Sequence, residues 1–106
     1  MSKQAKRQRQ HEQRQANRDA AMLHVEDVTR AALERGLRLR ISFITGPQSQ
    51  SPHWQFRDGQ TEERLLDWWP ATQRWWSART GERGRAADPW AVLEVARKLA
   101  GCVGVG

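Results

Sequence analysis

The sequence has little cysteine, no long apolar run and no apolar leader. A single cysteine, Cys102, in 106 residues excludes a disulfide within the chain and is typical of proteins in a reducing cytoplasm. No apolar segment approaches the ~18 residues that a membrane-spanning helix needs. The first residues also lack the apolar core of a signal peptide. We therefore expect a cytoplasmic protein that does not contact a membrane.

Common catalytic motifs are also missing. The sequence contains no paired cysteine motif, no H-E-x-x-H, no G-x-S-x-G and no phosphate-binding G-x-x-x-x-G-K-[ST]. His53 is the only histidine near the aromatic region, and the sequence offers it no orienting partner or nucleophile. His24 has no neighbours at metal-ligand spacing. We therefore expect a protein without enzymatic activity that uses neither a cofactor nor a metal.

The positive charge is concentrated in the first residues. The formal net charge is +6, yet residues 1–20 hold six Lys/Arg and two acidic residues, so the remainder is nearly balanced. Residues 1–19 contain no apolar side chain larger than alanine after Met1. Because short helices that pack against nothing are marginal in water, we predict a disordered basic arm or a frayed extension of the next helix. Such an arm could bind nucleic-acid phosphates or simply increase solubility.

The length suits one domain, which we place at residues 20–101. Ala21, Val25, Val28 and Ala32 recur at helical spacing and predict an amphipathic helix over residues 20–35. Asp19 is a residue type that caps helix N-termini, so we expect it to begin this helix.

A second helix is predicted over residues 88–101. Asp88 is a favoured N-cap residue, and Pro89 suits the first helical turn. Apolar residues then recur at helical spacing as far as Leu99. Residues 102–106 are expected to form a loose C-terminal end.

Two strands are predicted between these helices. Residues 37–44 alternate apolar and polar side chains, which places Arg38 and Arg40 together on a solvent-exposed face. Residues 46–52 have a loop composition, and residues 53–57 form the next strand. The buried face of these two strands is expected to carry Leu37, Leu39, Ile41, Phe43, Trp54 and Phe56.

Four of the six tryptophans lie within residues 65–76, on both sides of a Pro-containing turn. We predict a hairpin with strands at residues 64–69 and 74–78. The predicted cross-strand pairs are Asp67 with Trp76, Trp68 with Trp75, and Trp69 with Arg74. In this register, Leu66, Trp68 and Trp75 share one face, and Asp67, Trp69, Arg74 and Trp76 share the other. A slip by one residue would pair Trp69 with Trp75 and regroup the faces.

Residues 77–87 are predicted to form a basic loop that contains Arg79, Arg83 and Arg85. Gly81 and Gly84 have the G-x-x-G spacing that clamps nucleic-acid backbone in KH domains. In KH domains that motif lies between helices, whereas a strand precedes it here, so this assignment is disfavoured.

The predicted order gives an α+β fold, an antiparallel sheet of three to four strands with an N-terminal and a C-terminal helix (α-β-β-β-β-α). Both helices would cover one face of the sheet, and the other face would be basic and aromatic. Single-strand nucleic-acid binders use such a face. The candidate binding residues are Trp69, Trp76, Arg74, Arg57, Arg79, Arg83, Arg85, Arg38 and Arg40.

Two families resemble parts of the chain. The order of elements, Gly46-Pro47 and His53 are loosely similar to the double-stranded RNA-binding domain, although the loop spacing differs and the last helix lacks that family's basic start. Residues 64–100 resemble a hairpin with an aromatic-Pro-x-Thr-x-x-Trp motif, followed by a Gly/Arg loop and a helix, in small, mostly uncharacterised bacteriophage proteins. This second resemblance implies a phage origin, hence the host cytoplasm, and no specific activity.

Three functions remain open from the sequence. The first is binding of nucleic acid or a nucleoprotein through the basic and aromatic face. The alternative is a phage-encoded inhibitor of a host defence protein, similar to an anti-CRISPR protein, because Trp and Arg dominate protein-binding hot spots. In the third, the indoles only complete a core or a homodimer interface.

Overall fold

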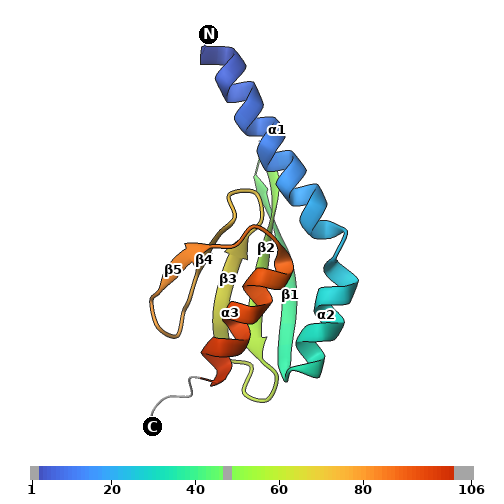
Figure 1. Cartoon of the computed structure of the whole chain (residues 1–106), viewed down its shortest axis with the longest axis vertical. Helices are drawn as coiled ribbons and strands as arrows, with labels where there is room; N and C mark the ends of the chain where they lie inside the picture. Colours follow the sequence, from blue (N-terminus) through green and yellow to red (C-terminus); the bar gives the residue numbers. More distant parts are fainter. Residues whose placement is uncertain (1–2, 47–48, 102–106) are drawn as a thin grey trace.

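Helices and one antiparallel sheet make up the molecule (Figure 1). The structure, a computed structural model, describes residues 3–46 and 49–101. Its elements in chain order are α1 (Lys3–Met22), α2 (Val25–Glu34), β1 (Leu37–Gly46), β2 (Ser49–Asp58), β3 (Arg64–Trp69), β4 (Arg74–Trp76), β5 (Arg83–Arg85) and α3 (Pro89–Gly101). The strands lie in the order β1-β2-β3-β4-β5. The predicted α+β fold is therefore confirmed, and the described sheet has five strands.

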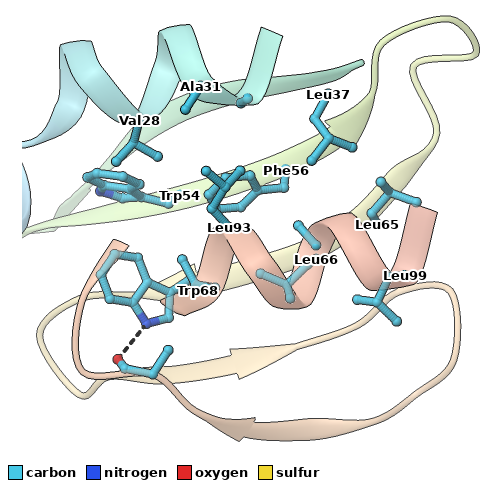
Figure 2. Close-up of a cluster of buried hydrophobic side chains, with 14 of the residues drawn as sticks. Val28, Ala31, Leu37, Trp54, Phe56, Leu65, Leu66, Trp68, Leu93 and Leu99 are labelled. Carbon is cyan, nitrogen blue, oxygen red and sulfur yellow. Dashed lines mark hydrogen bonds between the residues drawn. The ribbon is translucent and has the colours of Figure 1, made fainter. Parts of the chain in front are cut away.

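One face of the sheet forms the hydrophobic core with α2 and α3 (Figure 2). The predicted alternation explains this, since Leu37 of β1 and Trp54 and Phe56 of β2 are fully buried. Arg38 and Arg40, which alternate with the apolar residues of β1, are exposed. From the helices, Val28 and Leu93 are also fully buried. The side chain of Phe43, predicted to join this core, lies outside the described part of the chain.

Two tryptophans cross the centre of the core. Trp54 on β2 and Trp68 on β3 are cross-strand partners, and their rings meet edge to face at 5.2 Å between centroids. The indole N–H of Trp68 donates a hydrogen bond to the Ala86 carbonyl at 3.2 Å (Figure 2). This hydrogen bond satisfies the buried indole N–H and ties β3 to the segment that leads into α3.

The hairpin register is the one that the sequence predicts. Asp67 pairs with Trp76, Trp68 with Trp75, and Trp69 with Arg74. The turn closes through a hydrogen bond from the backbone N–H of Gln73 to the Trp69 carbonyl, with Gln73 at a φ of 62°. The alternative register is therefore not adopted, and β4 ends at Trp76, earlier than the predicted residue 78.

The N-terminal segment was predicted to be a disordered arm or a frayed extension of the next helix, and it is neither. Residues Lys3–Met22 form helix α1 instead. Gln, Arg and Ala favour helix, and side-chain hydrogen bonds one turn apart support it, such as Gln13 to Asn17 at 3.0 Å. At its C-terminal end Ala21 is buried in the core, whereas the sequence pattern assigned this residue to the apolar stripe of the next helix.

The predicted helix over residues 20–35 is also divided. α1 ends at Met22 and α2 begins at Val25, so the chain turns at Leu23 and His24. Asp19 does not cap α2, because the N-cap position is occupied by His24, which makes no capping side-chain hydrogen bond. The predicted N-cap of the last helix agrees with the structure, because Asp88 Oδ1 accepts a hydrogen bond from the Ala91 N–H at 2.9 Å. Past the end of α2, Gly36 has a φ of 74°.

Two predicted loops contain strand residues. Within residues 46–52, β2 already begins at Ser49, opposite Gly46 of β1, and the predicted loop residues 47–48 lie outside the described part of the chain. β3 ends before it reaches Pro52, so β2 is an edge there and accepts proline.

The second such loop is residues 77–87, which contains β5. This strand has the sequence Arg-Gly-Arg and no apolar alternation, so no pattern predicted it. It forms because Gly84 lies opposite Trp75, whose indole occupies the space above the glycine.

The chain turns directly after Asp58, at Gly59 and Gln60. Hydrogen bonds from the backbone N–H groups of Thr61 and Gln60 lower the pKa of the Asp58 carboxyl below its ordinary value of 3.8.

None of the helices in the described ranges is long and apolar enough to span a membrane.

Candidate functional site

The sheet face opposite α2 and α3, here called the open face, carries arginines from all five strands. The register places Arg40, Gln55, Asp67, Trp76 and Arg83 in one row across the sheet. The next row contains Trp69, Arg74 and Arg85. The remaining arginines of this face are Arg38, Arg57 and Arg64.

Asp67 is the one acidic residue in these described rows, and it is completely buried. His53 Nε2 lies 2.9 Å from Asp67 Oδ1, and Arg64 Nε donates to the same oxygen at 3.1 Å. Asp67 Oδ2 lies 2.6 Å from Arg64 Nη2, an ion-pair distance without regular hydrogen-bond angles. A buried carboxylate requires such partners, so Asp67 holds the side chains of His53 and Arg64 in place.

The imidazole of His53 in turn positions Trp69. The two rings stack nearly parallel, with centroids 5.0 Å apart and 8° between their planes. Asp67, His53 and Trp69 therefore form a continuous support, from a buried carboxylate to a half-buried indole. A side chain restrained in this way loses less conformational entropy when a ligand binds.

A hollow of about 700 Å³ lies beside this support, and we call it the β4–β5 hollow. The indole of Trp76 is 38% exposed here. Gly84 lies between two arginines of β5, and a side chain at this position would meet the Trp75 indole at 2.8 Å. The residues that line the hollow are Trp69, Thr72, Arg74, Trp75, Trp76, Arg83, Gly84 and Arg85.

The arginines of the β4–β5 hollow are exposed and have no acidic partner. Within the described part of the chain, the guanidinium groups of Arg74, Arg83 and Arg85 form no ion pair and no hydrogen bond. Arg74 and Arg85 are direct cross-strand neighbours. Like charges in that position destabilise a sheet. The arrangement is thus unfavourable for the isolated protein and favourable for an anion.

The other predicted residues divide into two groups. Arg38, Arg40 and Arg57 share the open face, on the β1–β2 side, where Arg38 pairs with Glu62 at 3.6 Å and Arg57 donates to Gln55 at 2.8 Å. Arg79 has a different role.

Arg79 joins separate parts of the fold. Its Nη1 donates to the Leu99 carbonyl at 3.1 Å, and its Nη2 lies 2.9 Å from Glu63 Oε2. Cations commonly bind the last carbonyls of a helix in this way. Arg79 therefore stabilises the C-terminal end of α3, and the structure does not bring it to the open face.

Sequence reasoning missed the roles of His53 and Asp67. A signal for them exists, because His53 precedes Trp54 and Asp67 precedes Trp68, and these two tryptophans are cross-strand partners. Since side chains alternate between the faces of a sheet, His53 and Asp67 lie together on the opposite face.

In residues 3–46 and 49–101, no three His, Cys, Asp or Glu side chains gather in a way that could hold a metal ion.

Comparisons of the chain with protein-family models, with curated proteins and with solved structures gave no match. The function must therefore be argued from the geometry of the open face. The resemblance to phage hairpin proteins stays a prediction.

Proposed function

We propose that the protein binds single-stranded nucleic acid through the open face. The observation that carries the proposal is the β4–β5 hollow, where the indoles of Trp69 and Trp76 are accessible beside three arginines without acidic partners. Bases would stack on the indoles, and the arginines would bind phosphates. Stacking on an aromatic side chain contributes roughly 1–3 kcal/mol per base.

A single strand fits this site better than a duplex. Indole stacking requires a base whose face is free, and the bases of a duplex are already stacked on one another. The site is a hollow on an exposed sheet, formed by short strands, and Trp69 is already oriented by His53 at 5.0 Å. Stacking is tolerant of sequence, so we expect little discrimination between bases.

The inhibitor of a host defence protein is the competing proposal. Trp and Arg at the centre of a surface also suit a protein target. The unpaired guanidinium groups favour a polyanion, because a protein surface would have to supply an acidic partner for each of them.

Fluorescence anisotropy with labelled single-stranded oligonucleotides tests the proposal. If Arg74, Arg83 and Arg85 each neutralise a phosphate, the logarithm of the affinity should fall against the logarithm of salt with a slope of about −2 or steeper. The double variant Arg74→Gln/Arg83→Gln should weaken binding about tenfold and reduce the slope by about 1.4.

The matched control removes the same charge elsewhere. Arg30 on α2 and Lys98 on α3 are exposed and lie outside the β4–β5 hollow. The variant Arg30→Gln/Lys98→Gln should bind like the wild type. Equal losses in both variants, tighter binding of a duplex, or no binding of any oligonucleotide by the wild type would contradict the proposal.

A further inference from the structure

Helix α1 encloses a second groove with the turn between β3 and β4. The groove has a volume of about 220 Å³. Asn17 Nδ2 donates a hydrogen bond to the Ala71 carbonyl at 3.1 Å, which fixes the helix beside the turn. Its lining residues are Gln10, Gln13, Arg14, Asn17, Ala71, Thr72, Arg74 and Arg85. The last two and Thr72 also line the β4–β5 hollow, so the groove and the hollow adjoin.

Three basic residues of α1 lie on one side of its axis, and both acidic residues lie on the other. Residues three, four or seven positions apart lie on the same side of a helix. Lys6 is therefore aligned with Gln10 and Asn17, and Arg7 is aligned with Arg14, all on the side of the groove. The acidic residues of the helix project from the opposite side, and they are Glu12 and Asp19. A solubilising helix has no need of this separation.

The acidic side of α1 is occupied by contacts within the helix. Gln8 donates to Glu12 at 3.5 Å, and Gln15 donates to Asp19 at 3.0 Å. No ion pair joins Lys6, Arg7 or Arg14 to an acid in the described chain. The cationic side is thus free to bind a ligand.

We propose that this groove holds the sugar–phosphate backbone of the single strand whose bases stack in the β4–β5 hollow. The inference rests on the proposed function and extends it to α1. Lys6, Arg7 and Arg14 would contact successive phosphates, and the amide groups of Gln10 and Gln13 would donate to phosphate oxygens. Its lining has no aromatic side chain, which suits backbone contacts instead of base stacking.

The shape of the molecule supports a long binding path. α1 has 20 residues and extends well beyond the sheet (Figure 1). At 1.5 Å per residue, the helix is about 30 Å long. A strand that follows α1 must therefore be longer than one that fills only the β4–β5 hollow.

The experiment compares oligonucleotides of about 5 and about 15 nucleotides, within the site sizes of single-strand binders. The probes are labelled thymidine oligomers, and the variant is Lys6→Gln/Arg14→Gln, since glutamine preserves helix propensity. We expect about tenfold weaker binding of the longer oligomer, a salt slope smaller by about 1.4, and less than a twofold change for the shorter one.

The control variant is again Arg30→Gln/Lys98→Gln, which should leave both affinities unchanged. Circular dichroism of both variants checks that α1 remains helical. If the wild type binds both oligomers and Lys6→Gln/Arg14→Gln binds the longer one as tightly, this inference fails while the proposed function stands. Equal loss for both oligomers, or equal loss in the control, also overturns it. If the wild type binds neither oligomer, the proposed function fails and takes this inference with it.

Discussion

The two faces of the β3–β4 hairpin carry two tryptophans each and have opposite environments. On the covered face Trp68 is buried to 1% exposure, and Trp75 is half-buried, packs against the core cluster and also lines the edge of the β4–β5 hollow. On the open face Trp69 is half-buried and Trp76 is 38% exposed. The residue type is the same and the positions are adjacent, so the helices that pack on one face decide which indoles become core.

The charges of the two faces differ even more than the indoles. The covered face buries Leu66 and Phe56 around Trp68, with no charged side chain in the described core cluster. On the open face, the buried charge of Asp67 is matched by Arg64, whereas the arginines of β4 and β5 have no partner. The described core cluster therefore contains no charge, whereas the open face keeps three guanidinium groups without an ion pair in the described part of the chain.

The largest expected effect comes from the covered face. Replacing Trp68 with alanine removes a buried indole and its hydrogen bond to Ala86, which should lower the free energy of unfolding by about 3–5 kcal/mol. Urea denaturation followed by circular dichroism measures this loss. A loss below about 1 kcal/mol would show that Trp68 is not part of a packed core.

A smaller effect is expected at the junction of the two faces. Asp67→Asn keeps the size of the side chain but removes the charge that binds His53 and Arg64, so we expect a loss of about 1–3 kcal/mol in unfolding free energy. Trp69 should also become less restrained, which acrylamide quenching of its fluorescence can detect. Unchanged stability and unchanged quenching would contradict the supporting role of Asp67.

Gly84→Ala tests how closely the covered face is packed at its edge. The added methyl group would lie 2.8 Å from the Trp75 indole, so the indole must shift, at a cost of about 1–3 kcal/mol. Thermal unfolding measures the cost. Gly81→Ala is the control for added side-chain volume, because a methyl group there meets nothing within 4 Å. This control variant also strains the backbone, since Gly81 has a φ of 76°. Wild-type stability of Gly84→Ala would show that Trp75 does not pack on β5.

The hairpin could be predicted from the sequence because one short turn and a strict alternation set its register. Asp67, Trp68 and Trp69 have the partners that this pattern predicts. The same pattern placed Trp69, Arg74 and Trp76 on one face, and all three line the β4–β5 hollow. Arg83 and Arg85 also line it, but they were predicted as loop residues, so the pattern assigned them to no face.

Other features have no apolar signal and therefore escaped prediction. α1 is stabilised by side-chain hydrogen bonds, which an apolar pattern does not show, and its buried Ala21 was predicted in the apolar stripe of the next helix instead. Arg79 appeared to belong with the neighbouring loop arginines, but it binds the carbonyl of Leu99, a residue distant in sequence. Only tertiary structure reveals such a contact.

The most direct test of the account compares two tryptophans of equal exposure. Trp76 on the open face and Trp90 on α3 are 38% and 40% exposed. We predict that Trp76→Ala weakens binding of a labelled single strand by about 5- to 150-fold, the effect of losing one stacked base, with less than about 1 kcal/mol lost in unfolding free energy. Trp90→Ala should bind like the wild type. Equal binding by the two variants, or a loss of stability in Trp76→Ala as large as in Trp68→Ala, would contradict the claim that the open face is the binding surface.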